Sequence, residues 1–373
     1  MLHQDKPKIL YYYAWQHFDT GSPKALAGLI DAMDRSRFEP MFVANGDGPL
    51  IEALIAKGVK VVSQGVGAVS YRRPLHSVRQ IRRMVTCLDE IQPALVHVMG
   101  FEWNLDLVLA AWVRHIPVVL HVHSPEAAAF RNLHRFAATK VLFCSEYERR
   151  HFQHLQRILP KTEILYNTVD VSRFAEALPK RRELGLKSDQ VAIGTIAQIS
   201  KRKGIDLILE VARLLPDDHL LFLIVGPDGA GEEQFAAEMR AQALEDPALR
   251  TRVRFLGSRQ DIPELLKSID LFVLPTRAEP FGIVIVEAMA SGIPVVTTNT
   301  GGVPEIVTSE EIGRLVSDFT PAAFASTIAE VLSLPDHGRA MAGKAQESVR
   351  QRFDRSVIGQ KLTSIYAEVL GLG

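Results

Sequence analysis

The segment Leu274–Val307 decides the fold; it reads LPTRAEPFGIVIVEAMASGIPVVTTNTGGVPEIV. An apolar strand comes first, and a polar loop carrying Glu279 follows it. Gly282 then opens a helix that contains Glu287, and a second apolar strand follows Gly292. This order of strand, helix and strand, with glycines at the turns, is typical of a parallel α/β sheet.

The start of this helix has the chemistry of a phosphate-binding site. Its first residues offer unpaired backbone N–H groups and the positive end of the helix dipole. Glu279 and Glu287 are eight residues apart, and the helical part of that interval advances about 7–8 Å. One carboxylate can therefore face a sugar while the other reaches a ribose, since carboxylates accept hydrogen bonds from sugar hydroxyls. A solvated surface position is the ordinary interpretation of either glutamate alone, but the whole segment favours a ligand site. The residues at the helix start are Phe281, Gly282, Ile283 and Val284.

Short apolar runs alternate with longer amphipathic runs along the chain, as in a parallel sheet flanked by helices. In the first half the expected strands are Lys8–Tyr13, Glu39–Val43, Val59–Val62, Leu95–Met99, Val118–His123 and Lys140–Cys144. The helices expected between them include Lys24–Met33, Pro49–Lys57 and Val78–Ile91.

The second half restarts the same alternation. Its expected strands are Val191–Ile196, Leu220–Val225, Val253–Leu256, Leu271–Leu274 and Pro294–Thr297. Its expected helices are Ile205–Leu215, Glu232–Leu244, Ile262–Ser268 and Ile283–Ala290. The charged segment Phe174–Asp189 is the expected linker, so residues 1–176 and 180–354 form two doubly wound domains with a ligand cleft between them. The final helix, Arg355–Leu370, could cap either domain.

Composition narrows the class of protein. A chain of 373 residues with 47% apolar and 23% charged residues suits two globular domains. The net charge is zero and nucleic-acid-binding motifs are absent, which disfavours a nucleic acid partner. The two cysteines, Cys87 and Cys144, lack metal-ligand spacing and indicate a reducing compartment. Without a signal-like or membrane-spanning apolar run, the sequence predicts a cytoplasmic protein.

Two common nucleotide-binding classes are disfavoured. The first expected strand leads into Ala14–Ser22, which lacks the Gly-x-Gly-x-x-Gly pattern of a nicotinamide dehydrogenase. The chain also lacks the Walker motif of a kinase or ATPase.

The spacing Glu279-x7-Glu287, with Pro280-Phe281-Gly282 and the run EAMASGIPVV from Glu287, resembles the retaining glycosyltransferases of family four. The likeness is specific in this segment and extends more weakly over nearly the whole chain. It implies the GT-B fold, with two Rossmann-like domains facing a central cleft. It also implies that the last helix (355–373) joins the acceptor-binding domain 1–176, whereas 180–354 binds the nucleotide-sugar donor.

The same resemblance assigns roles to the segment quoted above. Glu279 would contact the donor sugar as a catalytic-site residue, and Glu287 would bind the ribose hydroxyls. The backbone of Phe281–Val284 would contact the diphosphate or the sugar. The resemblance implies no metal and no other cofactor, because helix dipoles and basic side chains neutralise the leaving diphosphate.

A basic turn in the second half fits the family pattern with one departure. Lys203-Gly204 matches the end of the family's Arg-x4-Lys-Gly element, but Gln198 stands at the arginine position. Lys203 would hold the diphosphate, with Arg202 beside it. A diphosphate leaving group needs positive charge in a water-poor site, so the missing arginine affects either affinity or the donor's pose. A solvated basic turn is the alternative.

In the first half the resemblance selects His123, at the end of an expected strand, as the histidine that approaches the donor sugar. His121 points the same way but lies further back, where a packed core histidine is the expected role. Gly21-Ser22 replaces the family's Gly-Gly loop and would lie against the phosphate or the acceptor; a plain turn is the alternative.

A basic helix face raises the question of a membrane. Some members of the family act on lipid-linked acceptors, and cations on a helix face can bind anionic lipid at about 1 kcal/mol each. A solvated face is the main interpretation, because this segment lacks the aromatic-rich apolar side of an interfacial helix. Membrane contact is the alternative, and the residues concerned are Arg72, Arg73, Arg79, Arg82 and Arg83.

The resemblance, together with these residues, implies a metal-independent, retaining hexosyltransferase that moves a sugar from a UDP- or GDP-sugar to a hydroxyl of a glycan, glycolipid or small glycoside. Two alternatives stay open. One is a catalytically silent nucleotide-sugar-binding protein, favoured by Gln198. The other is a nucleotide-sugar epimerase of the same fold, for which the additional acid/base carboxylates are not identified.

Overall fold

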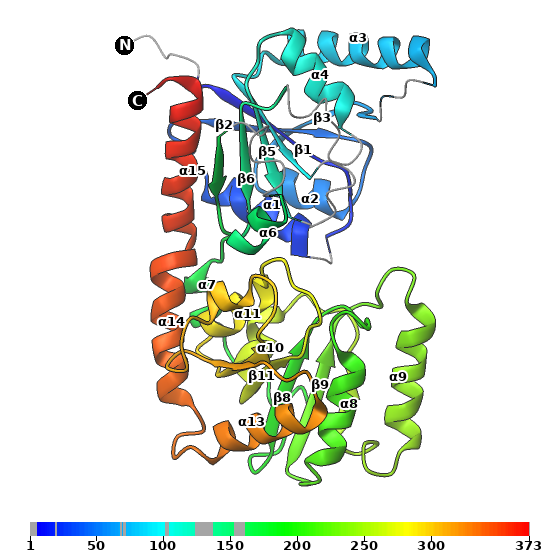
Figure 1. Ribbon diagram of the computed structural model, residues 1–373, viewed down its shortest axis with the longest axis vertical. Helices are drawn as coiled ribbons and strands as arrows, with labels where there is room; N and C mark the ends of the chain where they lie inside the picture. The colour runs from blue at the N-terminus through cyan, green and yellow to red at the C-terminus, as the bar shows by residue number, and fades with distance from the viewer. Residues whose placement is uncertain are drawn as a thin grey trace. The chain divides into compact units, whose positions relative to one another are not determined.

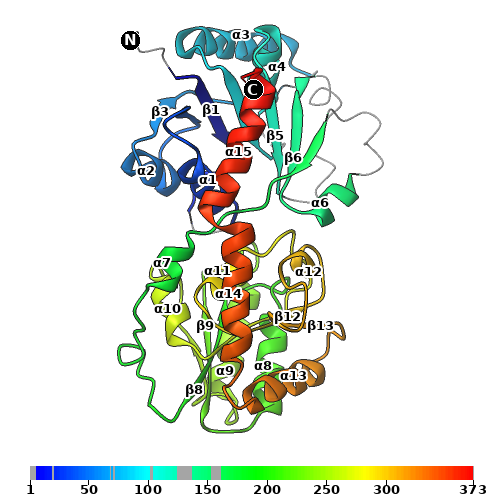
Figure 2. The ribbon, with the colours of Figure 1, turned by 90° about the vertical axis from the view of Figure 1, so that its left-hand side faces the viewer.

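The computed structural model describes residues 6–18, 21–67, 69, 72–100, 104–123, 137–152 and 161–372. The chain divides into two compact units, one formed by Met1–Thr168 with Arg355–Gly373 and the other by Val169–Asp354. Figures 1 and 2 show the elements of each unit. The division falls at residue 168, whereas the sequence placed it at residue 176. The difference arises because helix α7 (Val171–Ala175) packs on helices of the second unit.

The first unit is built on a seven-stranded, entirely parallel sheet of order β3-β2-β1-β4-β5-β6-β7. Its strands are β1 (Lys8–Tyr13), β2 (Glu39–Ala44), β3 (Lys60–Ser63), β4 (Leu95–Met99), β5 (Val118–Val122), β6 (Lys140–Phe143) and β7 (Thr162–Ile164). Its helices are α1 (Gly21–Ala32), α2 (Pro49–Ala56), α3 (Pro74–Ile91), α4 (Leu105–Val113), α6 (Glu146–His151) and α15 (Arg355–Leu370).

Both faces of this sheet are covered by helices. Leu10 and Tyr12 belong to a core shared with α3 and α4, whereas Tyr11, between them, contacts Tyr366 of α15. Because side chains alternate along a strand, these two sets of helices lie on opposite faces. Strands buried on both sides read as mainly apolar runs, and this explains the composition of β1, β4 and β5, in which His97 and His121 are the buried polar exceptions.

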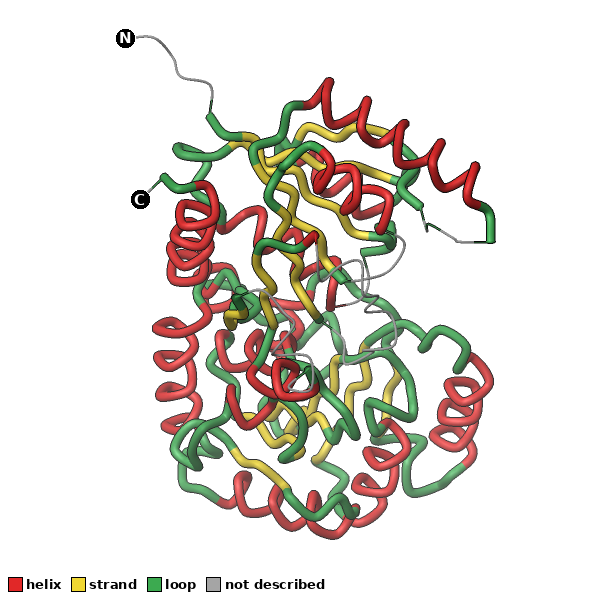
Figure 3. Tube along the Cα trace, turned by 45° about the horizontal axis from the view of Figure 1, so that its top comes forward, coloured by secondary structure: helices red, strands yellow, loops and turns green. Residues whose placement is uncertain are grey.

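The second unit contains a six-stranded parallel sheet of order β10-β9-β8-β11-β12-β13. Its strands are β8 (Val191–Ile196), β9 (Leu220–Val225), β10 (Val253–Phe255), β11 (Leu271–Leu274), β12 (Val295–Thr298) and β13 (Arg314–Val316). Besides α7, its helices are α8 (Ile205–Leu214), α9 (Glu233–Glu245), α10 (Ile262–Ser268), α11 (Ile283–Ala290), α12 (Val303–Ile306), α13 (Pro321–Ser333) and α14 (Arg339–Phe353). Figure 3 shows how helices and strands alternate.

The expected linker is anchored to the second unit. The Lys180 amide donates a hydrogen bond of 2.6 Å to the hydroxyl of Ser268, and the Arg181 guanidinium pairs with Asp270 at 2.8 Å. These bonds hold the segment after α7 along the sheet of the second unit, which leaves the crossing between the units at Thr168.

Strand order reverses once in each sheet. In the first unit β1 lies between β2 and β4, and in the second β8 lies between β9 and β11. In open parallel sheets ligands bind outside the carboxyl ends of the strands at such a switch point. The α/β class with two doubly wound parallel sheets, predicted from the sequence, is confirmed. Over the described ranges, no helix has the length and apolarity needed to span a bilayer.

One buried carboxyl generates a prediction about stability. Glu148, in the first turn of α6, is fully buried, and neither carboxyl oxygen has a hydrogen-bond partner. Burial raises its pKa from 4.5 to about 7. A raised folded-state pKa means that the folded protein binds this proton more tightly, so its stabilising effect is present at low pH and is lost as the pH rises to about 7.

We therefore expect Glu148→Gln to raise the free energy of unfolding by about 1–3 kcal/mol at pH 8 and by little at pH 4.5. Urea titrations at both pH values measure the difference. Glu146→Gln is the matched control, because Glu146 is paired with Arg149 at 2.9 Å. A gain of equal size at both pH values would contradict the assignment.

Candidate functional site

The switch point of the second unit brings two helix N-termini together. The loop after β8 ends at Gly204, the N-cap of α8, and the loop after β11 ends at Gly282, the N-cap of α11. Both glycines have positive φ angles, 73° and 111°, and neither helix has a side-chain cap. The first N–H groups of both helices are therefore free of side-chain caps at the carboxyl edge of the sheet, a favourable place for an anion.

An ion pair lies at this edge. The Lys203 ammonium donates a hydrogen bond to Oε2 of Glu279. The two side chains are only 12% and 10% exposed. A largely buried ion pair is strongly interdependent, since removal of one partner leaves an uncompensated charge. Two residues that the sequence assigned separately to the donor are thus in direct contact.

Arg277 joins the two loops. Its guanidinium makes a bidentate pair with Asp206 in the first turn of α8, at 2.8 and 2.7 Å. Its backbone amide donates to the carbonyl of Arg202 at 2.8 Å, and the Arg202 guanidinium donates to the carbonyl of Ala278 at 3.1 Å. Arg277 was not among the predicted residues, although it lies in the segment 274–307, two residues before Glu279. Its acidic partner, Asp206, lies 71 residues earlier in the chain, so no local signal pointed to it.

Glycines allow the loops to pack backbone against backbone. Gly301, with φ of 60°, lies so close to Glu279 that a Cβ atom would overlap the Glu279 carbonyl oxygen. The amide of Gly302 donates to that same carbonyl at 2.9 Å. The glycine pair thus fixes the backbone that carries Glu279.

The remaining predicted residues of this unit lie around the same edge. The side chain of Phe281 is buried and packs edge-on against Phe353, with ring centroids 5.5 Å apart, so its side chain belongs to the core. Ile283 and Val284 form the first turn of α11, and Glu287 follows one turn later; all three are partly buried. Gln198 is partly buried two residues beyond the end of β8.

The first unit carries the other predicted residues. His123 directly follows β5, and Gly21 with Ser22 begins α1; both places are at the carboxyl edge of the parallel sheet. His123 Nε2 is buried and has no hydrogen-bond partner. Burial and the neighbouring His121 and His97 hold the His123 pKa well below its usual value, so the ring is neutral.

The predicted basic face is exposed. Arg79, Arg82 and Arg83 lie on α3, and Arg72 and Arg73 immediately precede it. All five are exposed, and the neighbouring apolar side chains of Leu75 and Val78 are 86% and 48% exposed. Nothing in this arrangement tests contact with a membrane, which stays a prediction.

Side chains able to bind a metal do not cluster in the described ranges. No group of three or more His, Cys, Asp or Glu side chains there could hold a metal ion. Cys87 and Cys144 are both buried. Metal independence stays a prediction.

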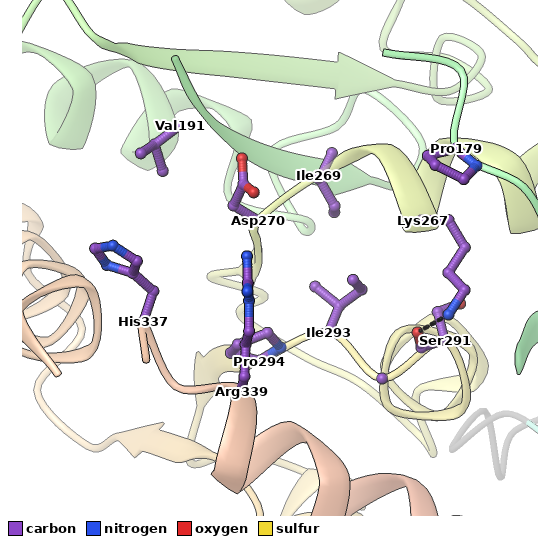
Figure 4. A pocket seen from close by; sticks show the side chains of 11 residues that line it. Pro179, Val191, Lys267, Ile269, Asp270, Ser291, Ile293, Pro294, His337 and Arg339 are labelled. Carbon is purple, nitrogen blue, oxygen red and sulfur yellow. Dashed lines mark hydrogen bonds between the residues drawn. The ribbon is translucent and has the colours of Figure 1, made fainter. Parts of the chain in front are cut away.

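A shallow cavity lies at the opposite edge of the second sheet. It has a volume of about 310 Å³, and Figure 4 shows its lining. Val191 begins β8, Asp270 precedes β11 and Pro294 precedes β12, so the cavity lies at the amino ends of these strands. The predicted site residues are at the carboxyl ends, and none of them lines this cavity.

The close packing at Gly301 can be tested by substitution. We expect Gly301→Ala to lower the free energy of unfolding by at least about 2 kcal/mol, because of its positive φ angle and the overlap with the Glu279 carbonyl. Gly343→Ala is the matched control: Gly343 is exposed on α14, and its Cβ would meet no atom within 4 Å. Alanine there should stabilise the helix by about 0.5–1 kcal/mol. Equal effects of the two substitutions on denaturant unfolding would refute the argument.

Family models match both halves of the chain. Residues 21–173 match the model described as Glycosyltransferase Family 4, and residues 178–348 match Glycosyl transferases group 1. The two matches together leave only the ends of the chain and a few residues between them uncovered.

Curated relatives match over part of their length. A D-inositol 3-phosphate glycosyltransferase of Mycolicibacterium vanbaalenii is 30% identical over 212 residues, 53% of this chain and 46% of the relative. A GDP-mannose-dependent monoacylated alpha-(1-6)-phosphatidylinositol monomannoside mannosyltransferase of Corynebacterium glutamicum is 29% identical over 241 residues, 60% of each protein. The chain spans about half the length of the first curated relatives that it matches.

Solved structures extend the likeness to the whole fold. Anabaena HepE, in complex with UDP and glucose, superposes with a TM-score of 0.81 at 23% identity, covering 97% of this chain and 100% of HepE. A glycosyltransferase from Rickettsia africae superposes with a TM-score of 0.84 at 18% identity, covering 99% of this chain and 100% of its own. At these identities the likeness concerns the fold alone. With its two parallel sheets and the two family matches, the chain belongs to glycosyltransferase family 4, the group 1 glycosyl transferases of GT-B fold.

Proposed function

We propose that this protein is a retaining, metal-independent glycosyltransferase that moves a sugar from a UDP- or GDP-sugar to a hydroxyl acceptor. The observation that carries the proposal is the buried Lys203–Glu279 pair beside the N-termini of α8 and α11. It combines a cation, a carboxylate and two sets of uncapped N–H groups, which together suit a sugar joined to a diphosphate.

The diphosphate would lie against the two helix N-termini. Lys203 would share its hydrogen bonds between Glu279 and the phosphate oxygens, because an ammonium has three donors. Glu279 would accept hydrogen bonds from the sugar hydroxyls. Glu287, eight residues further along the chain, would accept them from the ribose hydroxyls. Preorganised donors aimed at the charge that develops on the leaving group are commonly the largest single contribution to such catalysis.

In the transfer step the bond between the anomeric carbon and the phosphate oxygen breaks, and a bond from the acceptor oxygen to that carbon forms on the same face. The electron pair leaves with the diphosphate, and the acceptor's proton passes to a phosphate oxygen. No protein nucleophile is needed for this route. His123, neutral and with an unpartnered Nε2, would donate to or accept from a hydroxyl of the sugar.

The names of the relatives indicate the class of acceptor. The relatives' names include an inositol phosphate, a lipopolysaccharide core and a phosphatidylinositol monomannoside as acceptor systems. We propose a hydroxyl of a glycan, a lipid-linked sugar or a small glycoside. A lipid-linked acceptor would give the five arginines at α3 a role at an anionic surface.

The donor site can be tested without knowledge of the acceptor. We expect one of a set of UDP-, GDP- and ADP-sugars, with EDTA present, to raise the melting temperature, since a ligand at a hundredfold excess over Kd adds about 2.7 kcal/mol. Lys203→Met should lower the rate of donor hydrolysis or transfer by about 10²–10³-fold. Lys201→Met, in the same turn but exposed, is the matched control and should change the rate less than about threefold.

A double variant separates chemistry from folding. Lys203→Met alone leaves the Glu279 carboxylate buried without its cation, which costs stability. Lys203→Met with Glu279→Gln removes both charges and should restore the melting temperature but not the turnover. If a nucleotide sugar raises the melting temperature of the wild-type protein but no turnover follows, the result would instead support the catalytically silent binding protein. Gln198→Arg would then be the first variant to make.

The pH dependence tests His123. Because its pKa lies well below 6.5, the ring stays neutral over the range in which an exposed histidine titrates. We expect the ratio of kcat/KM between wild type and His123→Asn to stay constant from pH 6 to pH 8. A ratio that falls steeply below pH 6.5 would show that a histidine of ordinary pKa acts in the reaction.

A further inference from the structure

Three histidines form a buried row in the first unit. His97 of β4 and His121 of β5 have ring centroids 5.5 Å apart, and the rings of His121 and His123 are 4.2 Å apart. His97 and His121 are fully buried, and burial lowers the pKa of His121 to about 4 and that of His97 well below its usual value. All three rings are therefore neutral, and each has one protonated and one unprotonated nitrogen.

The row is anchored by two tyrosines on its far side. The hydroxyl of Tyr366, on α15, lies 2.7 Å from His97 Nδ1 and 2.7 Å from the hydroxyl of Tyr11. The Tyr11 hydroxyl is also 3.5 Å from Sδ of Met33. Burial raises the pKa of both tyrosines, so each hydroxyl keeps its single proton to donate.

The tautomer of His121 follows from its partner. His121 Nε2 lies 3.3 Å from the carbonyl oxygen of Leu165, and a carbonyl can only accept. Nε2 therefore carries the proton, and Nδ1, which is buried without a partner, has a lone pair. The unpartnered Nε2 of His97 is the other free nitrogen between the two rings.

Two directions of the hydrogen-bonded chain are then conceivable. In the first direction Tyr11 donates to Met33. Tyr366 then donates to Tyr11, and His97 Nδ1 donates to Tyr366. This leaves one unprotonated nitrogen on His97 and one on His121. If Tyr11 donates to Tyr366 and Tyr366 to His97, the proton of His97 is on Nε2. That N–H is a donor of the kind that the buried, unpartnered Nδ1 of His121 lacks, and the two ring centroids are 5.5 Å apart.

Only the second direction gives the two unpartnered nitrogens complementary roles, one as donor and one as acceptor. An unsatisfied buried polar group costs about 1–3 kcal/mol, whereas a thioether is only a weak acceptor and loses little. Hydrogen bonds then link Tyr11, Tyr366 and His97, the rings of His97 and His121 pack on each other, and His121 donates to the Leu165 carbonyl. The His121 ring also packs directly on His123 at the carboxyl edge of the sheet.

We propose that Tyr366, His97 and His121 are positioning residues for His123. Tyr366 fixes the tautomer of His97, His97 orients His121, and His121 holds the ring of His123 by direct packing. The functional part rests on the proposed function, which gives His123 its part in the transfer. A residue of the last helix thereby becomes necessary for catalysis without touching the substrate.

The test combines a spectroscopic and a kinetic measurement. With ¹⁵N-labelled histidine, NMR of the wild-type protein should show the His97 proton on Nε2, and Tyr366→Phe should shift the ring signals of His97, His121 and His123. The same variant should lower kcat about tenfold and leave the donor KM within twofold. His97→Phe should lower kcat similarly. The double variant should lower kcat no further than either single variant, because the effects of substitutions within one interacting network are not additive.

Thr363→Val is the matched control. Thr363 lies one turn before Tyr366 on α15, and its buried hydroxyl has no hydrogen-bond partner, so its removal should change neither the ring signals nor kcat. A His97 proton on Nδ1, or a folded Tyr366→Phe protein with kcat within twofold of wild type, would overturn the proposal. If the wild-type protein transfers no sugar, the proposed function fails, whereas the His97 tautomer and the response of the His123 signals still decide whether the row exists.

Discussion

The contact of backbone against backbone at the carboxyl edge of the second sheet is the constraint on which the site depends. A Cβ atom at Gly204 would overlap the carbonyl of Pro275, and one at Gly301 would overlap that of Glu279. Without side chains at these points, the loops after β8, β11 and β12 lie in direct contact. The same closeness accompanies the contact of Lys203 with Glu279 and places the N-termini of α8 and α11 at one edge of the sheet. The bidentate pair of Arg277 with Asp206 adds a charge-assisted clamp across the same loops.

In the first unit several polar rings are buried in one sheet. An isolated buried imidazole would cost free energy, and each of the two inner histidines offsets part of this cost with one hydrogen bond, His97 to Tyr366 and His121 to the Leu165 carbonyl. Tyr11 on β1 and Tyr366 on α15 anchor the row at His97, and the Leu165 carbonyl anchors it at His121. The polar row therefore ties the last helix to the interior of the sheet more specifically than apolar packing would. A second attachment at the surface, where Lys140 pairs with Glu368 at 2.6 Å, holds the end of the same helix.

Local patterns account for most of what could be predicted from the sequence. The strand before Glu279, the helix from Ile283 and the strand after Gly292 were all expected, because glycines and apolar periodicity act within a few residues. Helix α4 was missed since it is apolar on nearly every side and has no clear period. The short strands β7 and β13, three residues each, were also missed, whereas β10, equally short, was expected. The boundary between the units was displaced because α7 is placed by packing on α10 and α11, not by composition.

Side-chain partnerships across long stretches of chain lay beyond sequence reasoning. Lys203 and Glu279 were each assigned to a ligand, yet nothing local states that residues 76 positions apart hold each other. His97 and Tyr366 are separated by 269 positions, and their contact depends on α15 returning to the first sheet. Such contacts arise where parallel strands end together and a helix crosses over them, so their positions follow from topology and their chemistry from the side chains. Gln198, which stands where the family pattern has an arginine, also matters through the charge at the carboxyl edge of the second sheet. Gln198 is uncharged, so Lys203, Arg202 and the two helix N-termini supply the positive charge at this edge.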